Sequence, residues 1–328
     1  MTVARLVALL AFAGVAHAAV PPALPTFAQV RASTLSSESV LLDRHGSVLQ
    51  QLRVDASRRQ LDWTPLADVS PTVAAALVAG EDRRFHEHHG VDWSGLAGAA
   101  FDNLFRTLDG RAPRGGSTLT MQLAALLDPA LGAGGNRSLG QKWDQAQAAL
   151  ALERTWSKRE ILEAYLNLAS YRGELIGIRA ATLGLFGKMP SGVDADEAAI
   201  LVALLRAPGA MPVAVARRAC AILREGDDTA DCERARLLAS TRLAGRYRMP
   251  AQDALAPHVA ARLLRTPGSR VTSTLDADVQ RAALRSLGEH LAELRGRRVD
   301  DGAVVVLDNA SGEVVAYVGS SGLQSSAP

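Results

Sequence analysis

The sequence predicts a mainly α-helical protein, in which a short β-hairpin precedes a long helical segment and a strand, a helix and two further strands follow it. Aromatic residues make up only 4 % of the 328 residues, and the heavy use of Ala and Leu favours helix over sheet. Apolar residues recur with the helical period from Leu66 to Leu264, whereas apolar and polar residues alternate in the flanking stretches. With 48 % hydrophobic residues, the chain can bury a large core.

Three regions follow one another along the chain. Residues 38–63 alternate around the turn "DRHG" and predict a β-hairpin. Residues 64–264 form the predicted helical domain, with Gly- and Pro-containing loops at 108–116, 128–137 and 187–193. The final unit, 271–328, begins as a strand that leads into a helix, and "GAVVVLDNASGEVVAYVGS" then predicts two strands with a turn at 309–312.

The first twenty residues have the pattern of an export signal. Arg5 precedes an apolar run at 6–15, and the triplet Ala16, His17 and Ala18 provides a cleavage site after Ala18. The run is shorter than the roughly 20 apolar residues of a membrane-spanning helix, and an uncleaved anchor at 1–20 is the alternative. In both cases we expect the remaining chain to work outside the cytoplasm.

Cys220 and Cys232 are the two cysteines of the chain. In an exported protein they can form a disulfide. The periodicity of "VARRACAIL" favours the simpler interpretation that Cys220 is a buried helix thiol, because Cys often packs as a small hydrophobe. Their spacing matches no zinc-binding pattern. The 36 basic and 34 acidic residues are mixed along the chain, so no basic field predicts a nucleic acid partner.

The stretch "GEDRRFHEHHGVDW" concentrates ionisable groups directly after an apolar helix. Val73, Leu77 and Val78 share a helical face that ends at Gly80, so Glu81 and the acid after it fall at a helix end, where backbone groups lack internal partners. Taken alone, the stretch is also compatible with a solvated charged turn.

Two further stretches combine polar groups with apolar helices. In "GGSTLTMQLAALL" a Gly-rich loop leads into a helix whose hydroxyls and N–H groups can hold an anion, although an ordinary N-cap explains the same letters. In the segment 140–188, Ile161, Leu162 and Tyr165 bury one face of an amphipathic helix. Lys142 and Lys158, taken alone, are solvated charges.

In this order and at these distances, the three stretches resemble the glycosyltransferase domain of class A penicillin-binding proteins, family 51 of the glycosyltransferases, over about residues 40–320. The match to the motif Glu-Asp-x-x-Phe-x-x-His-x-Gly consists of Glu81, Asp82, Phe85, His88 and Gly90. The match to Gly-x-Ser-Thr with a following amide consists of Gly115, Ser117, Thr118 and Gln122, with Met121 where many members have a Gln. Further matches are Lys158, Ile161, Leu162, Tyr165 and Asn167 for the fourth motif, and Arg218 with Ile222 and Leu223 for the fifth. The residues of these motifs are most similar to those of the penicillin-binding protein 1C branch.

The resemblance implies a lysozyme-like helical domain, followed by the first strands and helix of an incomplete α/β transpeptidase domain. It also implies polymerisation of lipid II into glycan strands, with inversion at the anomeric carbon and release of undecaprenyl pyrophosphate. This chemistry requires a base near the acceptor hydroxyl and cationic or N–H donors on the pyrophosphate. Glu81 is the expected base. The residues expected to bind substrate are Asp82, Phe85, His88, Gly90, Ser117, Thr118, Gln122, Lys142, Lys158, Asn167 and Arg218.

The third family motif, Arg-Lys-x-x-Glu, departs from the family pattern. It reads Gln141, Lys142, Trp143, Asp144 and Gln145 in this chain, so an amide stands in place of the family carboxylate. We place Gln145 in the catalytic site, where its carbonyl orients Lys142. Because an amide is a poorer ligand than a carboxylate for a hard cation, we expect Mg²⁺ or Mn²⁺ to be held only weakly, and we assign no residue as a metal ligand.

A lipid substrate requires contact with a membrane surface. The stretch "VDWSGLAGAAFDNLF" places Val91, Trp93, Ala97, Ala100, Phe101, Leu104 and Phe105 at near-helical spacing, and Trp is typical of membrane interfaces. A plain core helix is the alternative. The resemblance favours bilayer contact at the periplasmic face of the inner membrane, with lipid II, the growing glycan strand and other cell-wall synthesis proteins as partners.

Two other functions stay open. No Ser-x-x-Lys, Ser-x-Asn or Lys-Thr-Gly motif follows residue 271, so we expect no penicillin-acylated serine in this chain. This absence and Gln145 motivate a catalytically weak scaffold, the remnant of a truncated bifunctional protein. A lysozyme-like enzyme that cleaves glycan is the other alternative, and the Lys and Arg positions suited to pyrophosphate argue against it.

Overall fold

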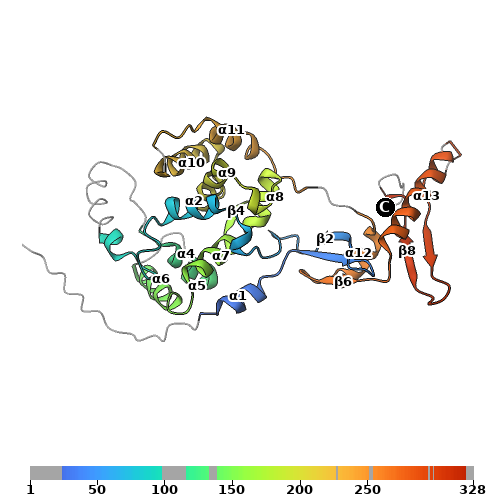
Figure 1. Cartoon of the computed structure of the whole chain (residues 1–328), viewed down its shortest axis with the longest axis horizontal. Coiled ribbons are helices and arrows are strands. Elements are labelled where there is room, and N and C mark those ends of the chain that lie inside the picture. Colours follow the sequence, from blue (N-terminus) through green and yellow to red (C-terminus); the bar gives the residue numbers. More distant parts are fainter. Residues whose placement is uncertain are drawn as a thin grey trace, which may run out of the picture.

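The structure is a computed structural model that describes residues 24–97, 116–132, 139–226, 228–250, 254–294, 296–297 and 299–322. Helices dominate, and most of them gather in one body at one end of the molecule (Figure 1). These helices are α1 (Phe27–Ser33), α2 (Pro71–Glu81), α4 (Leu119–Leu127), α5 (Pro129–Gly132), α6 (Leu139–Leu152), α7 (Lys158–Leu168), α8 (Ile178–Phe186), α9 (Ala195–Leu205), α10 (Pro212–Gly226) and α11 (Glu233–Arg242). The mainly α prediction is confirmed.

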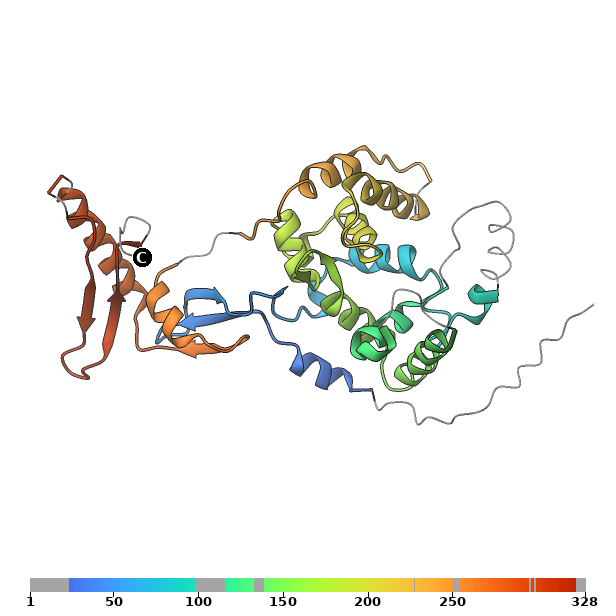
Figure 2. The same ribbon diagram turned by 180° about the vertical axis from the view of Figure 1, so that it is seen from behind.

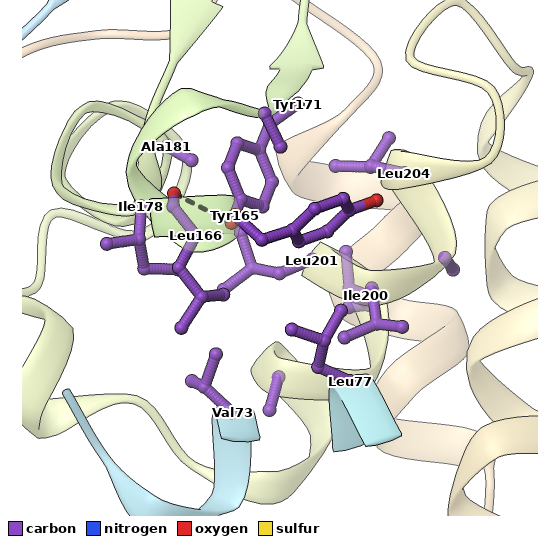
Figure 3. Close-up of a cluster of buried hydrophobic side chains, with 14 of the residues drawn as sticks. Val73, Leu77, Tyr165, Leu166, Tyr171, Ile178, Ala181, Ile200, Leu201 and Leu204 are labelled. Atoms are coloured by element: carbon purple, nitrogen blue, oxygen red, sulfur yellow. Dashed lines mark hydrogen bonds between the residues drawn. The ribbon is translucent and has the colours of Figure 1, made fainter. Parts of the chain in front are cut away.

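Helix α9 is the centre of this helical body. Asp194 caps its first turn, where the side chains of Asp194 and Glu197 form a reciprocal capping box. Every residue from 197 to 204 is buried, and α2, α10 and α11 pack around the helix. Ile200 and Leu201 of α9 face Leu77 of α2 in the core (Figure 3). The ends of α2 and α9 therefore lie side by side.

The hairpin consists of β1 (Glu38–Leu42) and β2 (Val48–Arg53), which pair antiparallel, and β6 (Arg270–Thr272) adds to β1 in parallel. The prediction of a hairpin through residue 63 is too long. The Arg53 guanidinium donates to the carbonyls of residues 55, 56 and 58 and stabilises a turn there. After this turn, β3 (Arg59–Gln60) joins β5 (Leu175–Ile176) and β4 (Ser170–Arg172) instead.

The remaining elements are α12 (Pro257–Leu263), α13 (Ala277–Glu293), β7 (Val304–Leu307) and β8 (Val314–Val318). They lie at the far end of the long axis from the helical body, as both views show (Figures 1 and 2). The strand, helix and two strands predicted here are confirmed. Gly312 takes a φ of +72° in the turn between β7 and β8, where a residue with a Cβ would be strained.

Several predictions fall partly outside the described residues. The export signal at 1–20 lies outside them, as do positions 98–105 of the predicted membrane-contact helix. At the start of that helix Val91 is buried and Trp93 is 54 % exposed. Part of the predicted loop at 128–137 is instead the short helix α5. Across the described ranges, no helix has the length and apolar character needed to cross a membrane.

The two cysteines form a disulfide, so the preferred interpretation of Cys220 as a free buried thiol is wrong. Cys220 lies on α10, and Cys232 immediately precedes α11. Because these two helices pack against each other, the Cα atoms lie 5.2 Å apart, within the range of a disulfide.

Candidate active site

A cavity of about 640 Å³ opens where α2 ends against α9 and α10. The loop after α2 and the start of α4 complete its described lining. Its polar and charged residues are Glu81, Asp82, Arg83, Arg84, Asp92, Ser117, Thr118, Arg206, Arg218 and Glu225. Of the residues predicted from the sequence, the cavity brings together Glu81, Asp82, Ser117, Thr118 and Arg218.

Glu81 is the last residue of α2, and its side chain is only 6 % exposed. Gly80 allows this placement, because a Cβ there would lie 2.8 Å from Val202 Cγ1 and 3.1 Å from Ile222 Cδ1. Gln122 Nε2 donates to Glu81 Oε2 at 3.1 Å, and Arg206 Nε donates to Oε1 at 3.2 Å. Burial raises the pKa of Glu81 above its ordinary value, while Arg206 and Gln122 oppose the rise.

Asp82 lines the cavity, but its carboxylate is fixed by the fold. His88 Nε2 lies 3.1 Å from both carboxylate oxygens, and the N–H of Leu119 donates to Oδ2 at 3.0 Å. Asp82 and His88 are both buried. This pair therefore connects the loop after α2 to the N-terminus of α4.

Thr118 is the N-cap of α4. Its Oγ1 accepts from the N–H of Met121 and donates to the carbonyl of Gly90 at 2.6 Å. The N–H of Gln122 also bonds to the Thr118 carbonyl, and Leu119 N–H is taken by Asp82. Two of the four N–H groups that a helix N-terminus leaves free, those of Leu119 and Met121, thus already have partners. Phosphate binding by the turn of Ser117 and Thr118 stays a prediction. Ser117, whose hydroxyl can donate, lies on the cavity wall.

Gly90 acts through its backbone. It has a φ of +89°, and a Cβ there would lie 2.6 Å from the carbonyl oxygen of Ala149. The loop thus passes directly over α6, with no room for a side chain. Gly90 therefore has a structural role, and its contact with substrate stays a prediction.

Phe85, Lys158 and Asn167 hold the site together and do not line the cavity. Phe85 is fully buried. The ammonium group of Lys158 lies 4.3 Å from the centre of the Phe85 ring, and it donates to the carbonyl of His88 at 2.6 Å and to Glu153 at 2.8 Å. Asn167 exchanges hydrogen bonds with the backbone of Thr64, at 2.8 Å in each direction. These contacts give the three residues structural roles, and the prediction that they bind substrate stays a prediction.

Lys142 and Gln145 both lie on α6 but have different surroundings. Lys142 is exposed and does not line the cavity. Gln145 is 2 % exposed, and its Nε2 donates to the backbone carbonyl of Leu131 at 2.5 Å. The amide nitrogen is therefore directed at α5, and the place of Gln145 in the catalytic site, with its carbonyl orienting Lys142, stays a prediction.

In the described part of the cavity, three carboxylates are already paired with cationic or imidazole side chains. Glu81 is bonded to Arg206, Asp82 to His88 and Asp92 to Arg84. Within the described residues, no group of three or more His, Cys, Asp or Glu side chains is placed to hold an ion. The described residues offer no set of free carboxylates for Mg²⁺ or Mn²⁺, so we derive no step through a metal. Weak metal binding stays a prediction.

Arg206 and Tyr165, which bond to Glu81 and to its partner Gln122, were not predicted from the sequence as site residues. Arg206 follows an apolar helix and gives no signal beyond its charge, because its partner Glu81 lies 125 positions away. In the sequence, Tyr165 is identified only as a position of the fourth motif and has no assigned role. Its hydroxyl donates to Gln122 Oε1 at 2.8 Å and completes a chain of hydrogen bonds to Glu81. Burial, then the charge of Glu81, raises the pKa of Tyr165, so the phenol stays protonated as a donor.

The cavity combines a buried carboxylate with guanidinium groups. Such an arrangement suits an enzyme in which the carboxylate accepts a proton from one substrate while the guanidinium groups bind an anionic group of another. A family model described as "Transglycosylase" matches residues 45–226, more than half of the sequence. The chain therefore belongs to the transglycosylase family.

Curated relatives agree with this family. A biosynthetic peptidoglycan transglycosylase of Rhodospirillum centenum is 40 % identical over 167 residues, which cover 50 % of this chain and 68 % of the relative. Penicillin-binding protein 1C of Escherichia coli is 46 % identical over 143 residues, 44 % of this chain and 18 % of the relative. Penicillin-binding protein 2D of Bacillus subtilis is 34 % identical over 212 residues, 63 % of this chain and 29 % of the relative. The chain thus spans less than a third of the two penicillin-binding proteins.

Proposed function

We propose that this protein is a peptidoglycan glycosyltransferase that polymerises lipid II into glycan strands with release of undecaprenyl pyrophosphate. The observation that carries the proposal is the placement of the Glu81 carboxylate. It is buried at the wall of a cavity, fixed by Gln122, and accompanied there by Arg206 and Arg218. Family membership supports the same reaction class.

The reaction assigns a role to each of these groups. The Glu81 carboxylate accepts the proton of the acceptor sugar hydroxyl, while the hydroxyl oxygen forms a bond to the anomeric carbon of the donor. The bond from that carbon to the pyrophosphate oxygen breaks, and its electron pair leaves with the pyrophosphate. Arg218 and Arg206 balance the charge that develops on the leaving group. Raising the pKa of Glu81 by burial makes it a stronger base than an exposed carboxylate.

The test is polymerisation of labelled lipid II by a Glu81→Gln variant. An amide cannot accept the hydroxyl proton, so we expect a loss of at least ~10²–10⁴ in rate. Glu87→Gln is the matched control, because Glu87 is an exposed residue of the same loop that does not line the cavity. Near-normal strand synthesis by Glu81→Gln would contradict the proposal, as would a wild-type protein that only shortens preformed glycan.

We also propose that the protein works on a membrane surface at the periplasmic side of the inner membrane. Two observations support this proposal. Residues 1–20 have the pattern of an export signal, and the exposed indole of Trp93 directly follows the cavity residue Asp92. A chain without residues 1–20 should float with liposomes that contain lipid II. Trp93→Asp should weaken flotation, whereas Val305→Asp, which alters an exposed residue of β7, should not. Flotation that is unchanged in Trp93→Asp would contradict this surface.

A further inference from the structure

Arg206 is the exposed half of an ion pair whose other half is buried. Its Nε bonds to Glu81 Oε1, and its Nη2 lies 3.4 Å from the carbonyl oxygen of Gly80. The Arg206 side chain is 60 % exposed, against 6 % for Glu81. Glu81 is held from its other side by Gln122. The carboxylate is therefore fixed in the fold, and Arg206 is the partner that can move.

A second guanidinium lies at the same end of α9. Arg218 Nη1 donates to the carbonyl of Ala203, one turn before Arg206, at 3.4 Å. The cavity's other two arginines, Arg83 and Arg84, are paired with Glu225 and Asp92. Within the described residues Arg218 has no carboxylate partner. An anion that enters the cavity thus finds Arg218 available and Arg206 beside it.

Glu81 and such an anion compete for Arg206. A guanidinium at a carboxylate favours the ionised form and weakens the carboxylate as a base. A pyrophosphate carries more negative charge than one carboxylate and offers several oxygens to a guanidinium fork, so it is the stronger partner. When Arg206 leaves, its own lowering effect on the pKa of Glu81 is lost, and Glu81 becomes a stronger base.

We propose that Arg206 exchanges partners during the reaction: it pairs with Glu81 in the substrate-free protein and moves to the pyrophosphate of the bound glycan donor, next to Arg218. The inference rests on the proposed function and deepens it. The exchange breaks no covalent bond. Its effect is that Glu81 gains full basicity only when the leaving group is in place.

The other titratable groups near Glu81 do not depend on donor binding in this way. Asp82, in the loop after α2, is fixed to His88, and Tyr165, on α7, is fixed to Gln122. The remaining charged groups of the lining, from that loop and from α10, are Arg83, Arg84, Asp92, Arg218 and Glu225.

The experiment compares the pH dependence of kcat/KM and of kcat for wild type and Arg206→Gln, with labelled lipid II as substrate. The first profile reports the free enzyme and the second the substrate complex. In Arg206→Gln we expect the acidic limb of kcat/KM to move to higher pH by about 1 unit, because a cation that lowered the pKa of Glu81 is gone. We expect the acidic limb of kcat to stay where it is in wild type, and KM to rise about tenfold through the lost phosphate contact.

Two control variants keep the result interpretable. Arg206→Lys retains the charge and should keep both acidic limbs near their wild-type positions. Arg217→Gln removes the same charge from an exposed residue of α10 that does not line the cavity, and should leave both profiles unchanged. If Arg206→Gln shifts the acidic limbs of kcat/KM and kcat equally, Arg206 stays on Glu81 in the substrate complex and the proposed exchange of partners is wrong. If it shifts neither limb, Arg206 does not control the basicity of Glu81, and the proposal is also wrong. An active Glu81→Gln variant would instead overturn the proposed function itself.

Discussion

The side-chain amide of Gln122 donates to the carboxylate of Glu81 at 3.1 Å, while its carbonyl oxygen accepts from the Tyr165 hydroxyl at 2.8 Å. The two hydrogen bonds fix which end of the amide faces Glu81. Since α4, α7 and α2 each contribute one member, the position of the carboxylate depends on the packing of three helices.

Tyr165→Phe should lower kcat without unfolding the protein. The variant removes the donor that orients Gln122, so the hold on Glu81 weakens. We expect kcat to fall about tenfold, equivalent to roughly 1.4 kcal/mol. Tyr171→Phe is the control, because Tyr171 is equally buried but its hydroxyl donates to the carbonyl of Leu166. Equal loss of kcat in both variants would show that the connection to Glu81 does not matter.

Gly80→Ala should impair catalysis more than folding. The new Cβ would lie 2.8 Å from Val202 Cγ1, so the end of α2 must move away from α9 and take Glu81 with it. We expect a stability loss of about 1–3 kcal/mol, measured by urea unfolding, and a fall in kcat that remains after correction for the folded fraction. Gly192→Ala, at a site with no atom within 4 Å of the new Cβ, should change neither. A fully active Gly80→Ala variant would contradict this view of the helix end.

Gln145→Glu should destabilise the protein and should not create metal dependence. The carboxylate would face the carbonyl of Leu131 at a position that is 2 % exposed and would lose the hydrogen bond. We expect a loss of about 1–3 kcal/mol in the free energy of unfolding. Gln147→Glu on the exposed face of α6 should stay within about 0.5 kcal/mol of wild type. A Gln145→Glu variant of normal stability whose activity follows added Mg²⁺ would restore the original interpretation.

Loss of the Cys220–Cys232 disulfide should destabilise the helical body. For a loop of this length we expect about 3 kcal/mol, measured by urea unfolding of a Cys220→Ala, Cys232→Ala double variant. Reductant should lower the stability of wild type to that of the double variant and leave the double variant unchanged. Insensitivity of wild type to reductant under unfolding conditions would argue against the bond.

The ion pair of Glu174 with Arg53 should make the stability of the folded protein depend on pH in the acidic range. The hydrogen bonds from Arg53, then from Tyr247, lower the pKa of Glu174 from 4.5 to about 2. Because the pKa is lowered in the folded state, the stabilisation is fully present above pH 4.5 and is lost as the pH falls toward 2. The Tm difference between wild type and Glu174→Gln should shrink over this range, whereas the exposed control Glu289→Gln should show a small, constant difference. A difference that does not change with pH would contradict the assignment.

The sequence by itself determined the features that depend on neighbouring residues. The helical period and the Gly-rich loop before it predicted α4, and the apolar face of Val73 and Leu77 placed Glu81 at the end of α2. The turn residues before Gly312 predicted the pairing of β7 with β8. These signals are local, since capping, turn geometry and periodicity act over a few residues.

The tertiary structure alone decided which motif residues face the cavity and which support it. Glu81 and Phe85 are positions of the same motif, yet Glu81 lines the cavity and Phe85 is fully buried. Motif spacing gives no partner for Arg206, and helical periodicity favoured a free thiol for Cys220, which is in a disulfide. Contacts between residues tens to more than a hundred positions apart depend on how α2, α9 and α10 pack, and no local pattern encodes the relative rotation and depth of packed helices.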